Sequence, residues 1–192
     1  MNKDILVNKL NPLEKDFIPE NLVKVQLIET PKLKDDMLTF LDVEAYQMFL
    51  LFRIEGLYNG VNMIVDSGYR PYEYQEYILK YNLLKKGLSA YKMVALPGQS
   101  EHQTGLALDF ALIINNIYVD NFDDSFKEVK WIHENAYKYG FILRYPKGKE
   151  DTTGFSYEYW HLRYVGKEVS YYMHNENIST LEEYHLLNYT KK

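Results

Sequence analysis

The chain has 192 residues, no cysteine and a formal net charge of −5. Its length suits one domain with a sizeable core, and its hydrophobic content of 46% is typical of globular proteins. The acidic balance argues against a nucleic-acid partner, since such proteins usually carry an excess of basic residues. The lack of cysteine excludes disulfides, thiol nucleophiles and cysteine-type zinc sites, so a metal site must use His, Asp or Glu.

The N-terminal sequence lacks the features of a signal peptide, because residues 1–17 hold neither an apolar core nor a small-residue cleavage site. The longest apolar runs, at 48–52 and 106–114, are too short to span a bilayer. We therefore expect no membrane segment and a cytoplasmic protein. Residues 1–35 contain three prolines and little periodicity, and they are predicted to form an arm that packs over the domain.

The pattern of apolar residues then predicts helices and strands in alternation. A helix is expected over about 42–58, a short strand near 61–66, and a second helix that starts at Pro71 and stops at Gly87. The later elements are expected to be a loop at 92–105, a strand at 106–114, a helix at 125–140, a strand at 141–145, a loop at 146–154, a strand at 156–165 and a last helix after a Ser179–Glu182 capping box. No repeat or linker divides the sequence, so 1–192 is predicted to be a single α+β domain.

The strand predicted at 106–114 carries one acid within an apolar run. Because side chains alternate faces along a strand, its large apolar residues share one face, and Asp109 lies on the other face beside Ala107 and Ala111. These small neighbours leave room for a ligand to approach the carboxylate. Taken alone, the pattern favours a buried acid whose oxygens accept hydrogen bonds from backbone N–H groups.

A second cluster changes this interpretation. Residues 158–161 (EYWH) place a carboxylate and an imidazole three positions apart. A catalytic zinc ion takes three His, Asp or Glu ligands and leaves one position for water, whose proton a further carboxylate accepts. His102, Asp109, His161 and Glu158 supply this set. In an ideal strand, Glu158 and His161 would face opposite sides, so a bulge or a strand end is expected between them.

Two motifs in this order, SxHxxGxAxD at 100–109 and ExWH at 158–161, carry a family resemblance. The sequence resembles the VanY-type D-alanyl-D-alanine carboxypeptidases, which are zinc peptidases of the LD-carboxypeptidase/Hedgehog-like fold. The likeness covers roughly residues 60–170, the expected catalytic core. It implies a small antiparallel sheet with flanking helices and one Zn²⁺ per chain.

The resemblance also implies roles for individual residues. His102, Asp109 and His161 would bind the zinc ion, and Glu158 would be the catalytic base that takes a proton from the attacking water. The water would then attack the carbonyl of a terminal D-Ala-D-Ala bond, and Glu158 would return the proton to the leaving amine.

The family's SGYR element is present at 67–70 and supplies Arg70. In relatives this arginine, a glutamine at the position of Gln75 and the motif serine at Ser100 contact the substrate's C-terminal carboxylate or the reacting carbonyl. A planar guanidinium after a glycine turn suits a bidentate grip of a carboxylate, although a solvent-exposed arginine at a helix start is the plainer alternative. Ser100 could instead cap the turn.

Most such carboxypeptidases carry an export signal or a membrane anchor, and none is visible in this sequence. The segments VALPGQSEHQTGLALD and YGFILRYP are similar to the cytoplasmic, bifunctional D,D-dipeptidase/D,D-carboxypeptidases (VanXY type) of glycopeptide resistance. The resemblance therefore implies an enzyme that cleaves D-Ala-D-Ala and D-Ala-ended peptidoglycan precursors and so contributes to vancomycin resistance.

Three other functions remain open from the sequence. The first is a peptidoglycan endopeptidase of the same superfamily, and the second is a non-catalytic zinc-binding interaction domain of the Hedgehog type. The third is a serine hydrolase that uses Ser100 with His102.

The segment His133-Glu134 begins like the HExxH zinc motif, but Tyr137 stands where the second histidine must be. The balance between dipeptidase and carboxypeptidase activity stays open, as do tolerance of D-Ser or D-Lac termini and the oligomeric state.

Overall fold

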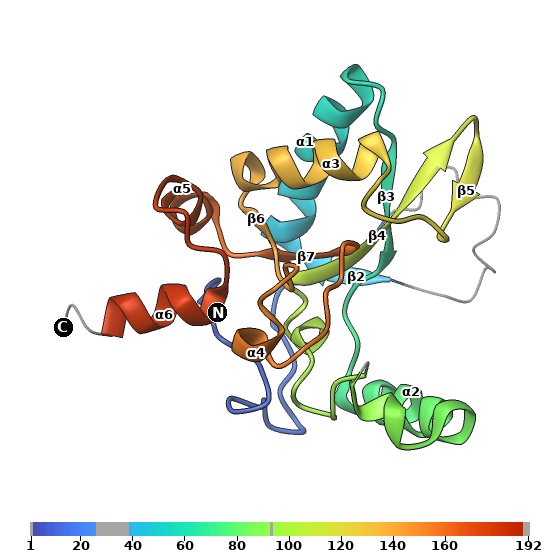
Figure 1. Ribbon diagram of the computed structural model, residues 1–192, viewed down its shortest axis with the longest axis vertical. Helices are drawn as coiled ribbons and strands as arrows, with labels where there is room; N and C mark the ends of the chain where they lie inside the picture. Colours follow the sequence, from blue (N-terminus) through green and yellow to red (C-terminus); the bar gives the residue numbers. More distant parts are fainter. Residues whose placement is uncertain (1, 26–38, 93, 190–192) are drawn as a thin grey trace.

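An antiparallel sheet forms the centre of the molecule (Figure 1). The computed structural model describes residues 2–25, 39–92 and 94–189. Five strands pair in the order β3-β4-β7-β6, with β5 added alongside β4, and every pairing is antiparallel. Their bounds are Met63–Ser67 for β3, Ala107–Ile114 for β4, Ile117–Val119 for β5, Phe141–Leu143 for β6 and His161–Tyr164 for β7. A separate two-stranded sheet pairs β1 (Leu22–Lys24) with β2 (Phe40–Asp42).

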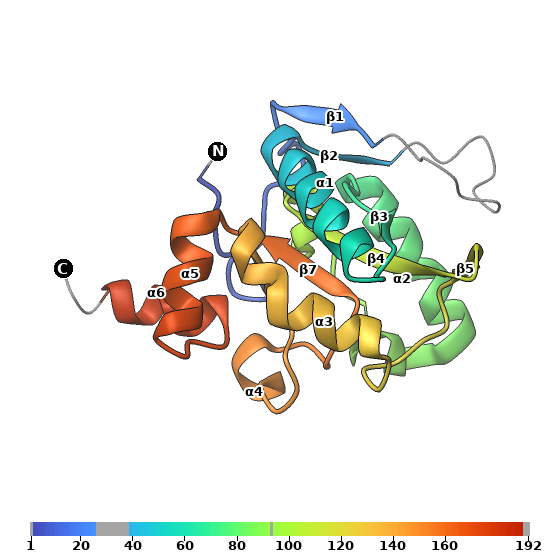
Figure 2. The same cartoon turned by 90° about the horizontal axis from the view of Figure 1, so that it is seen from above.

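Helices flank this sheet on both faces. Helices α1 and α3 lie over one face, α2 and α4 lie toward the other, and α5 and α6 lie beyond β6 (Figures 1 and 2). The α-helices span Val43–Tyr58 (α1), Tyr72–Lys86 (α2), Lys127–Asn135 (α3), Glu150–Thr153 (α4), Lys167–Asn175 (α5) and Leu181–Tyr189 (α6). Three 3₁₀ helices span Gly87–Lys92 (η1), Glu101–Thr104 (η2) and Ala136–Tyr139 (η3). The predicted α+β fold, a small antiparallel sheet with flanking helices, is confirmed.

The main core lies between the sheet and the helices α1 and α3. Leu108, Phe110 and Leu112 of β4 pack there with Phe49 and Phe52 of α1, and all five side chains are buried. This is the core face that the alternation along β4 predicts. Asp109 therefore faces away from the main core, toward the side on which α2 and α4 lie.

Several predicted element ends correspond to the observed ones. Helix α1 begins at Val43 after the Asp42 cap, and α2 follows Pro71 and ends at Gly87, whose φ is +59°. The expected loop at 92–105 contains η2, and the expected loop at 146–154 contains α4. Both helical segments are only four residues long, too short to show a periodic apolar pattern.

Two further expectations are corrected. The strand predicted at 156–165 is shorter, because residues before His161 form a turn in which the backbone N–H of His161 lies 3.3 Å from the Glu158 carbonyl. The capping box of α6 lies one residue later than predicted. The Thr180 hydroxyl accepts from the Glu183 backbone N–H at 3.1 Å, and the Glu183 carboxylate accepts from the Thr180 backbone N–H at 3.1 Å. Glu182 is thereby free for a different partner.

The N-terminal segment packs along the loop that precedes β4. The backbone N–H of Leu13 donates to Gly98 at 2.7 Å, and the Gln103 amide donates to the Glu14 carbonyl at 2.9 Å. Val7, within the same segment, is fully buried. Residues 26–35 of the predicted arm lie outside the described residues. Among the helices that the structure describes, none has the length and apolar character that a bilayer crossing requires.

Candidate metal centre

The pairing of β4 with β7 places two of the candidate ligands opposite each other. Asp109 and His161 are direct partners in the antiparallel register. His102 arrives from η2, which ends at Gly105 in the left-handed conformation with a φ of +68°. Gly68 is required on the other side of His102, because a Cβ there would collide with the Phe40 carbonyl. Short turns thus place His102, the third candidate ligand, next to Asp109 and His161 of the sheet.

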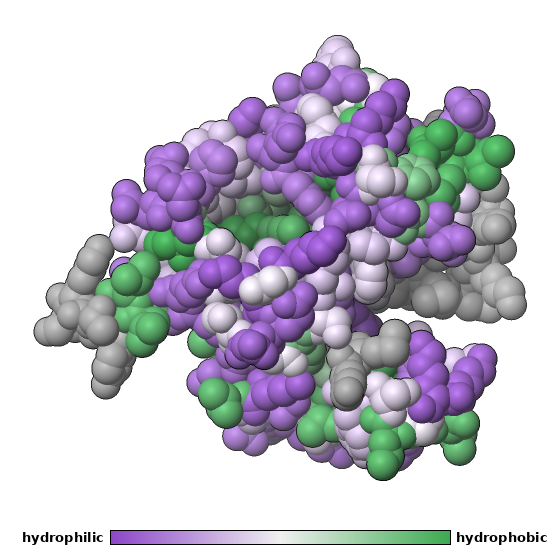
Figure 3. All heavy atoms as spheres, in the orientation of Figure 1, coloured by the Kyte–Doolittle hydropathy of each residue, from purple (hydrophilic) through white to green (hydrophobic). Residues whose placement is uncertain are grey.

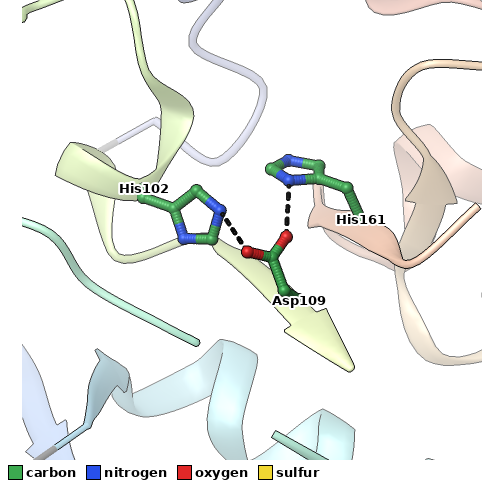
Figure 4. A group of neighbouring side chains, drawn as sticks. All are labelled: His102, Asp109 and His161. Atoms are coloured by element: carbon green, nitrogen blue, oxygen red, sulfur yellow. Dashed lines mark hydrogen bonds and ion pairs between the residues drawn. The ribbon is translucent and has the colours of Figure 1, made fainter. Parts of the chain in front are cut away.

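The three side chains point toward one another (Figure 4). The Nε2 atom of His102 lies 3.3 Å from Oδ2 of Asp109, and the Nδ1 atom of His161 lies 3.0 Å from Oδ1. One ligand atom from each residue lies within 4.8 Å of the other two. Both histidines are buried. The sequence-predicted set therefore comes together as one compact cluster of two imidazoles and a carboxylate.

Each imidazole has a partner that leaves one nitrogen for the cluster. The Nδ1 atom of His102 lies 2.6 Å from the Gly68 carbonyl, which can only accept, so Nδ1 carries the proton and the Nε2 lone pair faces Asp109. Burial, with Arg70 nearby, lowers the pKa of His102 to about 4, so this imidazole is neutral at pH 7. The Nε2 atom of His161 faces the carboxylate of Glu101 at 3.6 Å.

The pKa of His161 shifts in the opposite direction to that of His102. Burial lowers its pKa, but interactions with Asp109 and Glu101 outweigh this and raise the pKa of His161 to about 9. Metal binding at the Nδ1 atom of His161 must therefore displace a proton.

This donor set fits a zinc ion. Within the described ranges, His102 Nε2 is a buried atom without a hydrogen-bond partner, as expected of a nitrogen aimed at a ligand. Two imidazole nitrogens and one carboxylate oxygen correspond to the three protein ligands of an open zinc site. The Glu101 carboxylate, which faces Nε2 of His161, corresponds to the hydrogen-bonding partner that a zinc-binding histidine usually has on its other nitrogen. His102, Asp109 and His161 could thus hold one zinc ion.

Glu158 lies at the edge of this cluster. Its Oε2 atom lies 3.7 Å from the Nδ1 atom of His161. The turn before β7 is the strand end that the sequence required between the two residues, and it brings both side chains to the same side. Burial raises the pKa of the Glu158 carboxyl to about 7. A carboxyl with this pKa can both accept and donate a proton near neutral pH.

Arg70, Gln75 and Ser100 line the same cavity, which has a volume of roughly 190 Å³. The Arg70 guanidinium donates to Gln75 Oε1 at 3.2 Å and to Asp109 Oδ2 at 3.4 Å. The Gln75 amide in turn donates to the Ala95 carbonyl at 2.9 Å. The Ser100 side chain makes no capping bond to η2 within the described part of the chain, so the capping alternative is not supported.

Sequence reasoning missed a buried ion cluster behind the site. Glu101 accepts from Arg144 Nε at 2.7 Å and from Arg163 Nη1 at 2.7 Å, and all three side chains are fully buried. Burial alone would raise the pKa of Glu101, but the two arginines hold it well below its ordinary value. The signal in the sequence was an arginine within each of two apolar segments, FILRY at 141–145 and HLRYV at 161–165.

The other histidines lie outside the cluster. The Nε2 atom of His133 lies 2.8 Å from the Tyr159 carbonyl, and the ring of His174 stacks on Tyr137 with a centroid separation of 3.6 Å. Both line a second cavity of roughly 210 Å³ beside β6, visible as a hollow with an apolar floor in Figure 3. The Nε2 atom of His185 lies 2.6 Å from the Asp4 carbonyl. His133, His174 and His185 thus have partners of their own away from the metal cluster.

Comparison with known proteins gives consistent matches. The family model VanY, D-alanyl-D-alanine carboxypeptidase, matches residues 39–167. The protein named "Putative carboxypeptidase YodJ" from Bacillus subtilis is 39% identical over 93% of this chain, which spans 65% of YodJ. The bifunctional D-Ala-D-Ala dipeptidase and D-Ala-D-Ala carboxypeptidase VanXYC from Enterococcus gallinarum is 38% identical, with 96% of this chain and 94% of VanXYC covered.

Solved structures show the same architecture. The LdcB LD-carboxypeptidase matches with a TM-score of 0.83 and 39% identity, covering 94% of this chain and 84% of LdcB. A variant of the vancomycin-resistance D,D-pentapeptidase VanY in complex with Zn(II) matches with a TM-score of 0.78 and 31% identity, covering 96% of this chain and 99% of VanY. Zinc is thus present in a structural relative of this chain.

The geometry predicts that His161→Ala loses metal affinity. Removing an outer partner of a zinc ligand typically weakens binding about 10- to 100-fold, so removing a ligand should weaken it by more than about 100-fold. His174→Ala is the matched control and should bind zinc like the unmodified protein. Affinity is measured by competition with a chromophoric chelator, and the metal content by mass spectrometry. Full zinc occupancy in His161→Ala would remove this residue from the ligand set.

Proposed function

Because the chain belongs to the VanY family of D-alanyl-D-alanine carboxypeptidases, we propose that it is a zinc D,D-peptidase that hydrolyses D-Ala-D-Ala and the terminal D-Ala of peptidoglycan precursors. One observation carries the proposal. The candidate ligands His102, Asp109 and His161 line one small cavity together with a carboxylate, Glu158, and a guanidinium, Arg70. This is the set of groups that hydrolysis next to a free C-terminal carboxylate requires.

The cluster divides the catalytic work among its residues. A zinc ion at the three ligands would supply a Lewis acid that lowers the pKa of a bound water and polarises the scissile carbonyl. Glu158 stands 3.7 Å from the ligand nitrogen of His161, near enough to take a proton from a water at the cluster. After the attack, the same carboxyl returns the proton to the departing amine of D-Ala. Glu158 is thus base and then acid.

Arg70 gives the site its preference for chain ends. Its guanidinium reaches the cavity from the segment just before α2, and Gln75 holds it through the 3.2 Å hydrogen bond. A planar guanidinium binds a carboxylate with two parallel hydrogen bonds. Ser100 lines the same cavity and offers a hydroxyl. A substrate carboxylate at Arg70 would place the last peptide bond, rather than an internal one, at the cluster, which favours an exopeptidase over an endopeptidase.

An L,D-carboxypeptidase is a second candidate. The observation that favours it is the match to LdcB, at a TM-score of 0.83 and 39% identity. Both activities release a C-terminal D-Ala, so both need the same metal cluster and the same carboxylate grip. They differ in the residue before the scissile bond, which is D-Ala for one and an L-amino acid for the other.

The proposal extends to a biological role. Glycopeptide antibiotics bind D-Ala-D-Ala ends, so an enzyme that removes these ends would contribute to vancomycin resistance. Such a role requires the enzyme to meet the precursors before they are incorporated into peptidoglycan. The cytoplasmic location expected from the sequence is compatible with this role and stays a prediction.

Three substrates separate the candidate activities. They are the dipeptide D-Ala-D-Ala, a pentapeptide precursor that ends in D-Ala-D-Ala, and the tetrapeptide that ends in L-Lys-D-Ala. We expect release of D-Ala from the first two, loss of this activity with a chelator, and its return with added zinc. D-Ala release is measured by a coupled amino-acid oxidase assay. Cleavage of the tetrapeptide alone would establish the L,D activity, and an activity that survives the chelator but not a serine-directed reagent would favour a serine hydrolase.

Glu158→Gln should separate metal binding from catalysis. The amide cannot take up a proton from water, so kcat should fall by roughly 10²- to 10⁴-fold while one zinc ion per chain remains bound. Glu150→Gln, at an exposed position in α4, is the matched control and should turn over normally. The measurement pairs steady-state kinetics with metal analysis. Near-normal turnover by Glu158→Gln would refute its role as the base.

Arg70→Lys tests the carboxylate grip. A lysine keeps the charge but loses the bidentate geometry. Charged hydrogen bonds contribute about 1.5–3 kcal/mol, so kcat/KM should fall by roughly 10- to 100-fold. A substrate with a C-terminal amide supplies the internal check, since the unmodified enzyme and Arg70→Lys should then differ little. Arg53→Lys, on α1, is the control substitution. An equal loss with both substrates would contradict the assigned contact.

A further inference from the structure

Glu101 is a fully buried carboxylate whose two oxygens have different surroundings. Oε1 accepts two hydrogen bonds, from Arg144 Nε at 2.7 Å and from Arg163 Nη1 at 2.7 Å. Oε2 points the other way and lies 3.6 Å from Nε2 of His161. The carboxylate therefore stands between a pair of guanidinium groups and a candidate metal ligand.

Both arginines are held in place by their other donors. Arg144 donates its two terminal nitrogens to the Glu182 carboxylate of α6, at 2.8 and 2.7 Å. Arg163 donates Nη2 to the backbone carbonyls of Lys3 and Ile5, at 3.0 and 2.9 Å. Because these contacts come from α6 and from the N-terminal segment, neither guanidinium can rotate freely. The orientation of the Glu101 carboxylate is fixed with them.

His161 has the matching asymmetry. Its Nδ1 atom faces Asp109 at 3.0 Å, on the metal side, and its Nε2 atom faces Glu101. Over the described residues, Glu101 Oε2 and His161 Nε2 are both buried without a hydrogen-bond partner, and each is the polar atom that faces the other. An ionised carboxylate can only accept, so it stabilises a proton on Nε2 and leaves the Nδ1 lone pair for the metal.

We propose that Glu101 is a positioning residue that holds the proton of His161 on Nε2, and so presents Nδ1 to the zinc ion. The inference rests on the zinc site of the proposed function, but it concerns metal affinity and not the choice of substrate. Glu101 does not touch the reacting atoms. Its role is to set the tautomer and ring orientation of one ligand, with Arg144 and Arg163 as its anchors.

The variant Glu101→Gln gives a sharp test because its amide is asymmetric. Two arginine donors converge on the Oε1 position, so the amide oxygen must face them and the NH₂ group must face His161. A donor at that place opposes a proton on Nε2 and favours one on Nδ1, where the metal should bind. We expect zinc affinity to fall by roughly 10- to 100-fold.

Glu182→Gln is the matched control. It alters a partner of Arg144 in the same cluster but leaves the Glu101 carboxylate and its two arginine donors in place, and among the described residues Glu182 forms no hydrogen bond or ion pair with His161. It should lower the thermal midpoint of the metal-free protein while leaving zinc affinity within about twofold. If Glu182→Gln weakens zinc binding as much as Glu101→Gln does, the effect belongs to general loosening of the cluster, and the inference is overturned.

A second measurement needs no variant. In the zinc-loaded unmodified protein, imidazole ¹⁵N–¹H correlation spectra should show His161 with a proton on Nε2 that exchanges slowly with water. A proton on Nδ1 instead would overturn the inference, even if Glu101→Gln fails to fold. Unchanged zinc affinity in a folded Glu101→Gln would do the same.

These outcomes are separable from those of the proposed function. A protein that binds zinc with the expected tautomer, yet cleaves none of the three substrates, would refute the proposed activity and leave the role of Glu101 intact. A protein with normal peptidase activity whose zinc affinity does not depend on Glu101 would refute only the inference. Failure of the unmodified protein to bind zinc would overturn both.

Discussion

The register between β4 and β7 is the constraint on which the site depends. It pairs Asp109 with His161, and in the same ladder it pairs Leu108 with Leu162. Because side chains alternate along both strands, the leucine pair enters the core when the Asp–His pair faces the cavity. A slip of one residue would exchange the two faces, expose the leucines and bury the carboxylate among apolar groups. The hydrophobic core and the candidate metal centre are therefore specified by one set of hydrogen bonds.

The buried ion cluster adds a second level of organisation. Glu101, Arg144 and Arg163 are charged groups without exposure to solvent, and such groups cost desolvation energy that their mutual attraction only partly offsets. Removing one partner of a buried pair leaves an uncompensated charge and typically costs about 3–5 kcal/mol. The cluster is thus a weak source of stability but a strong constraint on geometry. It also ties β6, β7 and α6 to the N-terminal segment, so elements beyond the matched residues 39–167 support a ligand within them.

Local signals in the sequence account for much of the fold and of the site. Pro71 and Gly87 delimit α2 because each has a backbone preference that stops or starts a helix. The alternation along β4 places Asp109 correctly, and the spacing of the two motifs identifies the residues that the structure gathers in one cavity. The predicted break between Glu158 and His161 followed from the same rule, although the sequence could not say whether it was a bulge or a strand end. It is a turn before β7.

The features that sequence reasoning missed depend on contacts between distant residues. In the sequence, nothing distinguishes Glu101 from an ordinary residue beside His102. Its role emerges only in the fold, where arginines 43 and 62 positions away pack against it. The β1–β2 pair likewise has no periodic signal, because each strand is three residues long. Such elements are stabilised by tertiary context rather than by their own propensity.

Substrate choice must be set by a different part of the cavity from the one that binds the chain end. Arg70, Gln75 and Ser100 would meet a terminal carboxylate that is the same in D,D and L,D substrates, so their contacts cannot distinguish the two. The residue before the scissile bond differs between the two substrates in both configuration and size. Besides the groups expected to meet the chain end, the cavity is lined by Phe155 and Trp160. A small methyl group and a long L-lysine side chain make different demands on a cavity wall. Under the proposed function, we therefore expect discrimination between the two activities to come from wall residues such as these rings and not from the groups that meet the chain end.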